Sequence, residues 1–171
     1  HASGPNGPVH AGFEVHIDPS PQTCTSLLMD RHLGGRFRSW ALVGAYGDNL
    51  GSVADELALA SGFDATQRTK LRQLGEAVNY NAYGDSPSDV CIAPRALYAL
   101  MARHADPLQM LAHEPVVDVI LRRREADLKQ ADALTPYWQS DHARVCVLPD
   151  APWSRRVIGD HRDSRSDRPE R

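Results

Sequence analysis

The chain has 171 residues, which is enough for one ordinary domain or for a lobe of a larger protein. Hydrophobic residues make up 42% of it, so a packed core is feasible. The net charge of −3 argues against a protein that coats nucleic acid nonspecifically, although a nucleotide or a short strand bound through metal ions stays compatible with it.

Cysteine spacing and hydropathy exclude further classes. The three cysteines lie far apart, which predicts neither a disulfide framework nor a zinc ribbon and favours a reducing, cytoplasmic setting. No apolar run approaches the length of about 18 residues that a membrane span needs, and no signal-peptide pattern is present. We therefore expect no membrane partner. The first residue is histidine, which indicates a processed chain or a piece of a longer one.

Short elements are expected along the first eighty residues. Residues 13–17 alternate apolar and polar side chains, which predicts a strand. A helix is expected over about 23–33, ended by two glycines. The apolar segment 40–46 is predicted to be buried, but its length does not separate a strand from a helix. Helices over 53–60 and 64–80 complete this part, the second opened by capping-box spacing.

The remainder is predicted to be mainly helical. A loop over 81–90 is followed by a helix over 94–103 with proline in its first turn, and a further short helix begins at Asp106. The longest helical stretch runs over about 114–134 and contains acid–base pairs in the favourable i,i+4 order. A short strand is expected over 145–148.

The segment WALVGAYGDN at 40–49 places Asp48 directly after a run of apolar or small residues. A carboxylate at the mouth of a buried segment is costly unless a cation lies beside it, so metal ligation is one explanation. A turn or capping aspartate is the other, because Gly-Asp and Asp-Asn are common in turns. Asp55 ends a similar string, GSVAD, but also suits the first turn of a helix, where negative charge is favoured.

Hydroxyls and arginines supply two further candidate groups. Thr23, Thr25 and Ser26 follow Pro19 and Pro21. Their hydroxyl groups either cap a helix or hold a phosphate at its N-terminus. Paired arginines after Trp153 have the chemistry to meet phosphates and bases. His16 lies in the alternating segment and is interpreted as a solvent-facing or edge residue. The candidate substrate-binding residues are therefore Thr23, Thr25, Ser26, Arg155 and Arg156.

Three strings, taken in order, resemble the DHH phosphoesterase superfamily and its RecJ-like branch. They are EVHIDPSPQTCTSLLMDRHL at 14–33, WALVGAYGDN at 40–49 and SVADELALASGF at 52–63. In that family a manganese-binding Asp-His-His motif precedes a strand, a helix start rich in serine and threonine, and an apolar segment that ends in Gly-Asp. Later strings, VCVLPD and WSRRVIG, resemble the start of the family's DHHA1-type lobe.

The resemblance implies a set of site residues and a cofactor. Asp48 would be a metal ligand, with Asp55 as the fallback, and His1 would be the last histidine of the Asp-His-His motif. Two manganese ions, or magnesium in their place, would activate a water and stabilise the charge that develops on a phosphodiester. The hydroxyl and arginine groups named above would contact the substrate.

The resemblance also implies an architecture. The expected fold is α/β, a helix-rich fragment of a doubly wound DHH domain with a long linker helix and the first strand of a second lobe. The predicted parts are the C-terminal part of the DHH domain at 1–80, a helical connector at 81–140, the start of a DHHA1-like substrate-binding lobe at 141–159, and a disordered charged tail at 160–171.

The predicted function is metal-dependent phosphodiester hydrolysis of a short oligonucleotide, single-stranded nucleic acid or a cyclic dinucleotide. The upstream acidic motifs and the glycine-rich histidine motif of the family do not occur in the chain, so it is expected to be incomplete at both ends and inactive alone. The alternative is a non-enzymatic helical interaction or regulatory module. The sequence leaves a homodimer open.

Overall fold

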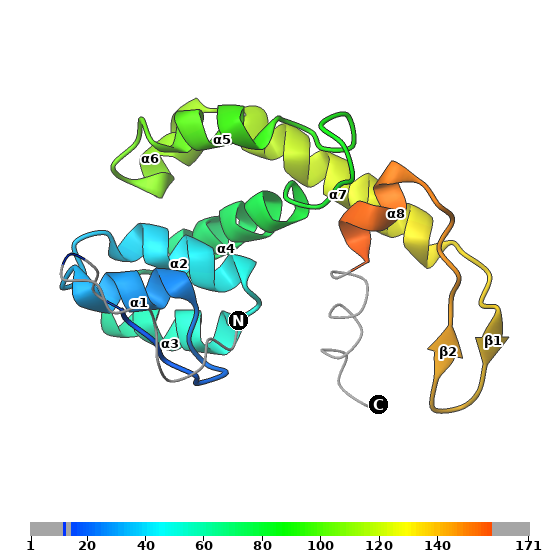
Figure 1. The fold of residues 1–171 in the computed structure, drawn as a ribbon, viewed down its shortest axis with the longest axis horizontal. Helices are drawn as coiled ribbons and strands as arrows, with labels where there is room; N and C mark the ends of the chain where they lie inside the picture. Colours follow the sequence, from blue (N-terminus) through cyan, green and yellow to red (C-terminus); the bar gives the residue numbers. More distant parts are fainter. Residues whose placement is uncertain (1–11, 13–14, 159–171) are drawn as a thin grey trace. The chain divides into compact units, whose positions relative to one another are not determined.

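The computed structural model describes residue 12 and residues 15–158. These residues form a helix-rich structure with one small two-stranded sheet, which is compatible with the α/β class in general (Figure 1). The chain divides into two compact units, unit 1 up to Gly75 and unit 2 from Glu76 onward. Among the described residues, no helix combines the length and the apolar character that crossing a bilayer requires. The predicted tail at 160–171 lies outside the described residues.

Unit 1 is built from helices whose small and aliphatic side chains form its core. Leu42, Ala45, Leu71 and Leu74 are fully buried, and α1 packs against α2, which packs against α3. The elements are α1 (Thr25–His32), α2 (Arg38–Gly47), α3 (Gly51–Ala60) and α4 (Ala65–Tyr80), the last turn of which belongs to unit 2.

The apolar segment 40–46 is helical and lies within α2. Its buried positions include Leu42, Ala45 and Tyr46, a spacing that puts them on one face of a helix. The helix ends at Asp48, and the left-handed backbone of Asn49 (φ 59°) then turns the chain toward α3.

The predicted strand at 13–17 is not formed in its described part. Residues 15–17 belong to neither a helix nor a strand, and the side chains of Val15 and Ile17 are 43% and 53% exposed. The first two residues of the predicted strand lie outside the described residues. Alternating apolar and polar side chains give a strand only where a neighbouring strand pairs with its backbone N–H and C=O groups. The described residues of unit 1 contain no strand that could pair with this segment.

Helices α2 and α4 approach each other closely at two glycines. A Cβ atom on Gly75 would lie 2.5 Å from the carbonyl oxygen of Val43 and 2.8 Å from the backbone nitrogen of Gly47. A Cβ atom on Gly47 would lie 3.0 Å from the carbonyl oxygen of Gly75. The contact is therefore made by backbone atoms, which cannot rotate away as side chains do.

Unit 2 contains the remaining helices and the sheet. In β1 and β2, Trp138 pairs with Val145 and Gln139 with Arg144 in an antiparallel register. The predicted loop over 81–90 is confirmed, and its described residues form no helix or strand. The elements are α5 (Pro94–Met101), α6 (Pro107–His113), α7 (Val116–Asp132), β1 (Trp138–Gln139), β2 (Arg144–Val145) and α8 (Pro152–Val157).

The C-terminal strand prediction needs correction. Only the first residue of the predicted strand at 145–148 is paired, and its partner is the neighbouring β1 in a hairpin. The described residues form no parallel sheet, so a doubly wound arrangement is not assembled within them. Helix α8 was not predicted, although Pro152 at its start is a favourable first-turn residue.

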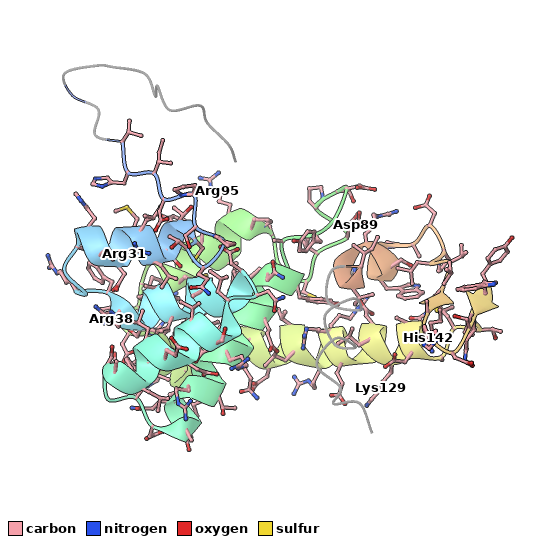
Figure 2. All side chains as sticks on the ribbon, turned by 90° about the horizontal axis from the view of Figure 1, so that it is seen from below. Arg31, Arg38, Asp89, Arg95, Lys129 and His142 are labelled. Atoms are coloured by element: carbon pink, nitrogen blue, oxygen red, sulfur yellow. The ribbon has the colours of Figure 1, made fainter. Side chains whose placement is uncertain are left out.

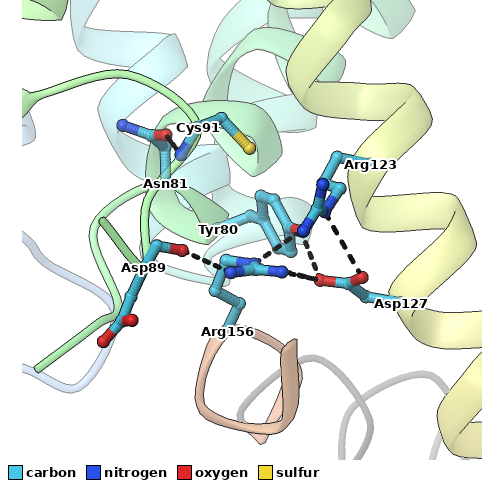
Figure 3. A network of polar contacts seen from close by, with 7 residues as sticks. All are labelled: Tyr80, Asn81, Asp89, Cys91, Arg123, Asp127 and Arg156. Atoms are coloured by element: carbon cyan, nitrogen blue, oxygen red, sulfur yellow. Dashed lines mark hydrogen bonds and ion pairs between the residues drawn. The ribbon is translucent and has the colours of Figure 1, made fainter. Parts of the chain in front are cut away.

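A buried polar network in unit 2 joins α4, α7 and α8 (Figure 3). The Asp127 carboxylate accepts hydrogen bonds from the hydroxyl of Tyr80 and from Nη2 of Arg156, both at 2.6 Å. Arg156 also donates to the backbone carbonyl of Asp89. Asp127 and Arg156 are only 4% and 3% exposed. Burial, together with the hydrogen bond to Asp127, raises the pKa of Tyr80 above its usual range.

The close approach of α2 and α4 predicts that Gly75→Ala destabilises unit 1. Helix propensity would favour alanine by about 1 kcal/mol, but the added methyl group meets backbone atoms that have to move. We expect a net loss of about 1–3 kcal/mol in the free energy of unfolding, measured in urea. Lys70→Ala, at an exposed position of the same helix, should change it by less than about 0.5 kcal/mol. Equal effects of the two changes would contradict the packing argument.

The buried network predicts a large effect for Asp127→Asn. The change leaves the Arg156 guanidinium without its charge partner in a buried site, which typically costs about 3–5 kcal/mol. Arg123→Ala serves as the control, because Arg123 pairs with the same carboxylate at 3.7 Å but is 60% exposed. We expect about 0–1 kcal/mol for the control, measured by urea unfolding.

Candidate functional site: a polar pocket at Asp48

A polar pocket of about 490 Å³ in unit 1 brings together several of the predicted site residues. Asp48 enters it from the end of α2, and Thr25 enters it from the first turn of α1. The segment that precedes α1 supplies the remaining polar side chains, namely those of His16, Asp18 and Thr23. Three of the predicted residues, Thr23, Thr25 and Asp48, thus share one pocket.

The turn before α1 is held by Asp18. One oxygen of its carboxylate accepts from the backbone N–H of Ser20 at 2.9 Å, and the other accepts from the hydroxyl of Thr23 at 2.9 Å and from Arg31 at 3.1 Å. The Ser20 bond, followed by those from Thr23 and Arg31, lowers the pKa of Asp18. Because Arg31 also donates to Thr23, the Thr23 hydroxyl is already used in building the turn.

The other two predicted hydroxyls differ in what they contact. The Ser26 hydroxyl donates to the carbonyl of Ala41 at 3.0 Å and ties α1 to α2, so the structure gives it a packing role rather than a place in the pocket. Thr25 is exposed at the start of α1. The residue before it, Cys24, does not cap the helix with its side chain, so its thiol covers none of the first N–H groups of α1.

Asp48 is exposed rather than buried, which changes the argument made from the sequence. Its backbone N–H donates to the carbonyl of Gly44 at 2.9 Å and closes α2. Among the described residues, no side chain pairs with its carboxylate. The desolvation cost that suggested a metal therefore does not arise, and what distinguishes Asp48 is an exposed carboxylate at a polar pocket.

The imidazole ring of His16, which lines the pocket, contacts a second imidazole ring, that of His32. The rings of His16 and His32 are edge-to-face with their centroids 4.6 Å apart. His16 lines the pocket and is exposed, in agreement with the interpretation of it as a solvent-facing residue. The contact joins the segment before α1 to the last residue of α1, and the sequence contained no signal for it.

Asp55 has a different environment from Asp48. Its carboxylate accepts from the Tyr46 hydroxyl and from Arg72, both at 2.7 Å, and from Arg68 at 3.5 Å. Burial raises the pKa of Asp55, but the bonds from Tyr46 and Arg72 outweigh it and the net pKa is lowered. Burial and the bond to Asp55 raise the pKa of Tyr46 to about 12. Asp55 therefore links α2, α3 and α4 and lies outside the pocket.

The two arginines predicted to contact substrate are engaged in unit 2. Arg156 is buried in the network with Tyr80 and Asp127, which contradicts a role on an open binding surface. Arg155 pairs with Asp85 at 3.2 Å and also with Asp150. The two arginines that follow Trp153 predicted a nucleic-acid contact. The prediction was wrong for Arg156 because the acidic partner that buries it is distant in the sequence.

The pocket offers the kinds of ligand atom that a manganese ion binds, but it offers too few of them. Asp48 supplies a carboxylate and His16 an imidazole, which are ligand types that manganese accepts. Within the described residues, however, no group of three or more histidine, cysteine, aspartate or glutamate side chains is arranged to hold a metal ion. His1, the other predicted ligand, lies outside the described residues.

Comparisons with protein-family models, with curated proteins and with solved structures find no match for this chain. The likeness to the DHH superfamily therefore stays a prediction that depends on the three sequence strings.

The contacts of Asp55 predict how unit 1 responds to acid. Because its pKa in the folded state lies below the unfolded value of about 3.9, its contribution to stability is complete above that pH and is lost as the pH falls through the folded-state pKa. Asp55→Asn should lower the free energy of unfolding by about 1–2 kcal/mol at pH 7. Urea unfolding at a series of pH values should show this difference shrinking below about pH 4.

The control for this prediction is Glu56→Gln, at an exposed position of α3 in the same unit. It should leave the free energy of unfolding within about 0.5 kcal/mol of the wild-type value at pH 7. A difference between Asp55→Asn and the wild type that does not depend on pH would contradict the assignment.

Proposed function

We propose that this chain belongs to a manganese-dependent phosphoesterase of the DHH type, in which Asp48 is one of the carboxylate ligands. On this proposal unit 1 is part of the DHH domain, and residues 141–159 begin a DHHA1-like lobe. The substrate is a phosphodiester of nucleotides, namely a short oligonucleotide, a single strand or a cyclic dinucleotide.

The observation that supports the proposal is the pocket that Asp48 shares with Thr23 and Thr25. These residues come from two of the strings that resemble the family, and helices α1 and α2 with the loop between them separate Thr23 from Asp48 in the sequence. An exposed carboxylate with no side-chain partner among the described residues is available for a cation. Salt-bridged aspartates such as Asp18 and Asp55 are not available in this way.

The residues of the pocket have separate tasks on this proposal. Asp48 holds a metal ion, which when bound supplies charge stabilisation at the phosphoryl group and a more acidic water. Thr25 and the first N–H groups of α1 face the side where phosphate oxygens would lie. Arg31 and Asp18 keep the turn at Thr23 in place, and Asp18 and Thr23 both line the pocket.

A non-enzymatic interaction module is the second candidate function, and one feature of unit 2 favours it. The hairpin of β1 and β2 leaves Trp138 and Val145 51% and 47% exposed, and Tyr137 and Val147 beside the strands are 81% and 65% exposed. Isolated two-stranded sheets are marginally stable in water, and exposed apolar groups of this kind often mark contact surfaces. On this alternative Asp48 is a helix-ending residue with no metal.

Paramagnetic broadening by manganese separates the two functions. We expect that adding Mn²⁺ to the ¹⁵N-labelled chain broadens the amide signals of Asp48, Leu50 and Thr25 before those of other residues. Asp48→Asn should weaken this selective effect by about tenfold or more, because the carboxylate is lost while the side-chain shape is kept.

Glu56→Gln is the control, since Glu56 is an exposed acid of the same unit outside the Asp48 pocket. It should leave the broadening at Asp48 unchanged. If Mn²⁺ broadens signals without preference for the pocket, or equally in Asp48→Asn, the metal-ligand role of Asp48 is wrong and the interaction module is favoured.

A further inference from the structure

The outer edge of β2 in unit 2 is an unpaired strand edge. Strand β2 pairs with β1 on one side, through a turn that contains His142 (Figure 2), and the chain continues as Cys146, Val147 and Leu148. None of these three residues forms a backbone hydrogen bond with another described residue. A row of unpaired N–H and C=O groups on an exposed edge is able to pair with a strand of another chain.

The segment after β2 keeps the character of an extended strand. The side chains of Val145 and Val147 are 47% and 65% exposed, whereas those of Cys146 and Leu148 are half-buried. Alternation with a period of two is that of an extended backbone, in which successive side chains point to opposite faces. The strand therefore continues in geometry beyond the last residue that β1 pairs with.

The backbone groups of this segment alternate between two edges. The carbonyl of Val145 accepts from the backbone N–H of Tyr137 at 2.8 Å, so it points toward β1. In a strand the groups of the next residue point the other way, which directs those of Cys146 and Leu148 to the free edge. Pro149, which has no N–H, falls in the set that points away from the free edge and does not interrupt it.

The side chains that usually prevent edge pairing do not occur in this segment. Natural strand edges carry charged residues or proline, whereas residues 145–148 read VCVL. Valine is also among the residues that favour strands most. The edge of β1 is less suitable, because Pro136 lies just before it and removes one donor.

We propose that a second copy of this chain pairs with the free edge of β2. The two edges run antiparallel about a two-fold axis at Val147, which lies opposite Val147 of the second copy. The N–H and C=O groups of Cys146 then bond to those of Leu148 in the second copy, and the reverse. Two hairpins combine in this way into one four-stranded sheet.

Charges at the two ends of the paired segment favour a second copy in this register. With Val147 on the axis, residue 144 lies opposite residue 150, so Arg144 of each copy faces Asp150 of the other. Nε and Nη2 of Arg144 have no hydrogen-bond acceptor among the described residues. The Asp150 side chain pairs with Arg155 but is 95% exposed, so it is open to a further cation. An axis at Cys146 would instead leave Arg144 opposite an apolar side chain, that of residue 148.

The larger sheet also brings apolar side chains together. Trp138 pairs with Val145, so both share a face of the hairpin with Val147, and Trp138 is 51% exposed. A two-stranded sheet is marginal in water, whereas three or more strands with an apolar face are stable. The paired segment is short, which predicts a weak dimer that dissociates on dilution.

The dimer gives the second candidate function, an interaction module, a specific partner. It does not rest on the proposed phosphoesterase, because none of its residues lines the Asp48 pocket. Failure of the dimer therefore leaves the role of Asp48 untouched, and failure of manganese to bind leaves the dimer untouched.

Disulfide trapping tests the register in a chain whose three native cysteines are replaced by alanine. Val147→Cys should form a dimer linked by a disulfide under mild oxidation, because the Cα atoms of residues opposite each other in such a pair are about 4.5 Å apart. Val145→Cys is the matched control on the same face, with a similar exposure. Its two copies lie four residues out of register, about 13 Å apart along the strands, and should form the disulfide at least about tenfold more slowly.

Amide hydrogen exchange of the unaltered chain tests the pairing without added cysteines. Raising the protein concentration should slow exchange at Cys146 and Leu148 but not at Val147, whose N–H points away from the free edge. Val147→Lys places two like charges opposite each other, so it should weaken self-association by about tenfold or more. Val119→Lys, at a 50% exposed position of α7, should associate as the wild type does.

The outcomes decide the proposal. Exchange that slows at the two expected amides, together with selective trapping of Val147→Cys, supports the dimer. Exchange that does not depend on concentration, equal trapping of the two cysteine variants, or self-association of Val147→Lys equal to that of the wild type overturns it.

Discussion

The contact of Arg156 with Asp127 joins parts of unit 2 that are far apart in the sequence. Tyr80 reaches the same carboxylate, and Arg156 also donates to the backbone of Asp89 in the loop between α4 and α5. A guanidinium that is 3% exposed has to find its hydrogen bonds inside the protein. The position of α8, and with it the return of the chain from the hairpin, therefore depends on this one side chain.

Unit 1 is organised by the same constraint on charge. Asp18, Asp30 and Asp55 each have an arginine partner, and each pair connects an element to the next one along the chain. Asp48 differs from these three, because its carboxylate is exposed and no side chain among the described residues neutralises it. The contrast separates the aspartates whose ion pairs hold the fold together from Asp48, for which we propose a role as a metal ligand.

The polar pocket at Asp48 combines groups of different chemistry. The Asp48 pocket offers an exposed carboxylate, threonine hydroxyls and imidazole, which suit a cation and a phosphate.

Local signals in the sequence determined most of the helices. Capping-box spacing and apolar periodicity predicted the helix that became α4, and prolines marked the starts of α5 and α6. Thr23, Thr25 and Asp48 line one pocket, and the resemblance to the DHH superfamily, which stays a prediction, had put them among the expected site residues. Only the tertiary structure decided that segment 40–46 is a helix, that Asp48 is exposed, and that Arg156 is buried with Asp127. Each of these features depends on contacts with residues that are distant in the sequence. A local sequence pattern does not show which distant residues those are.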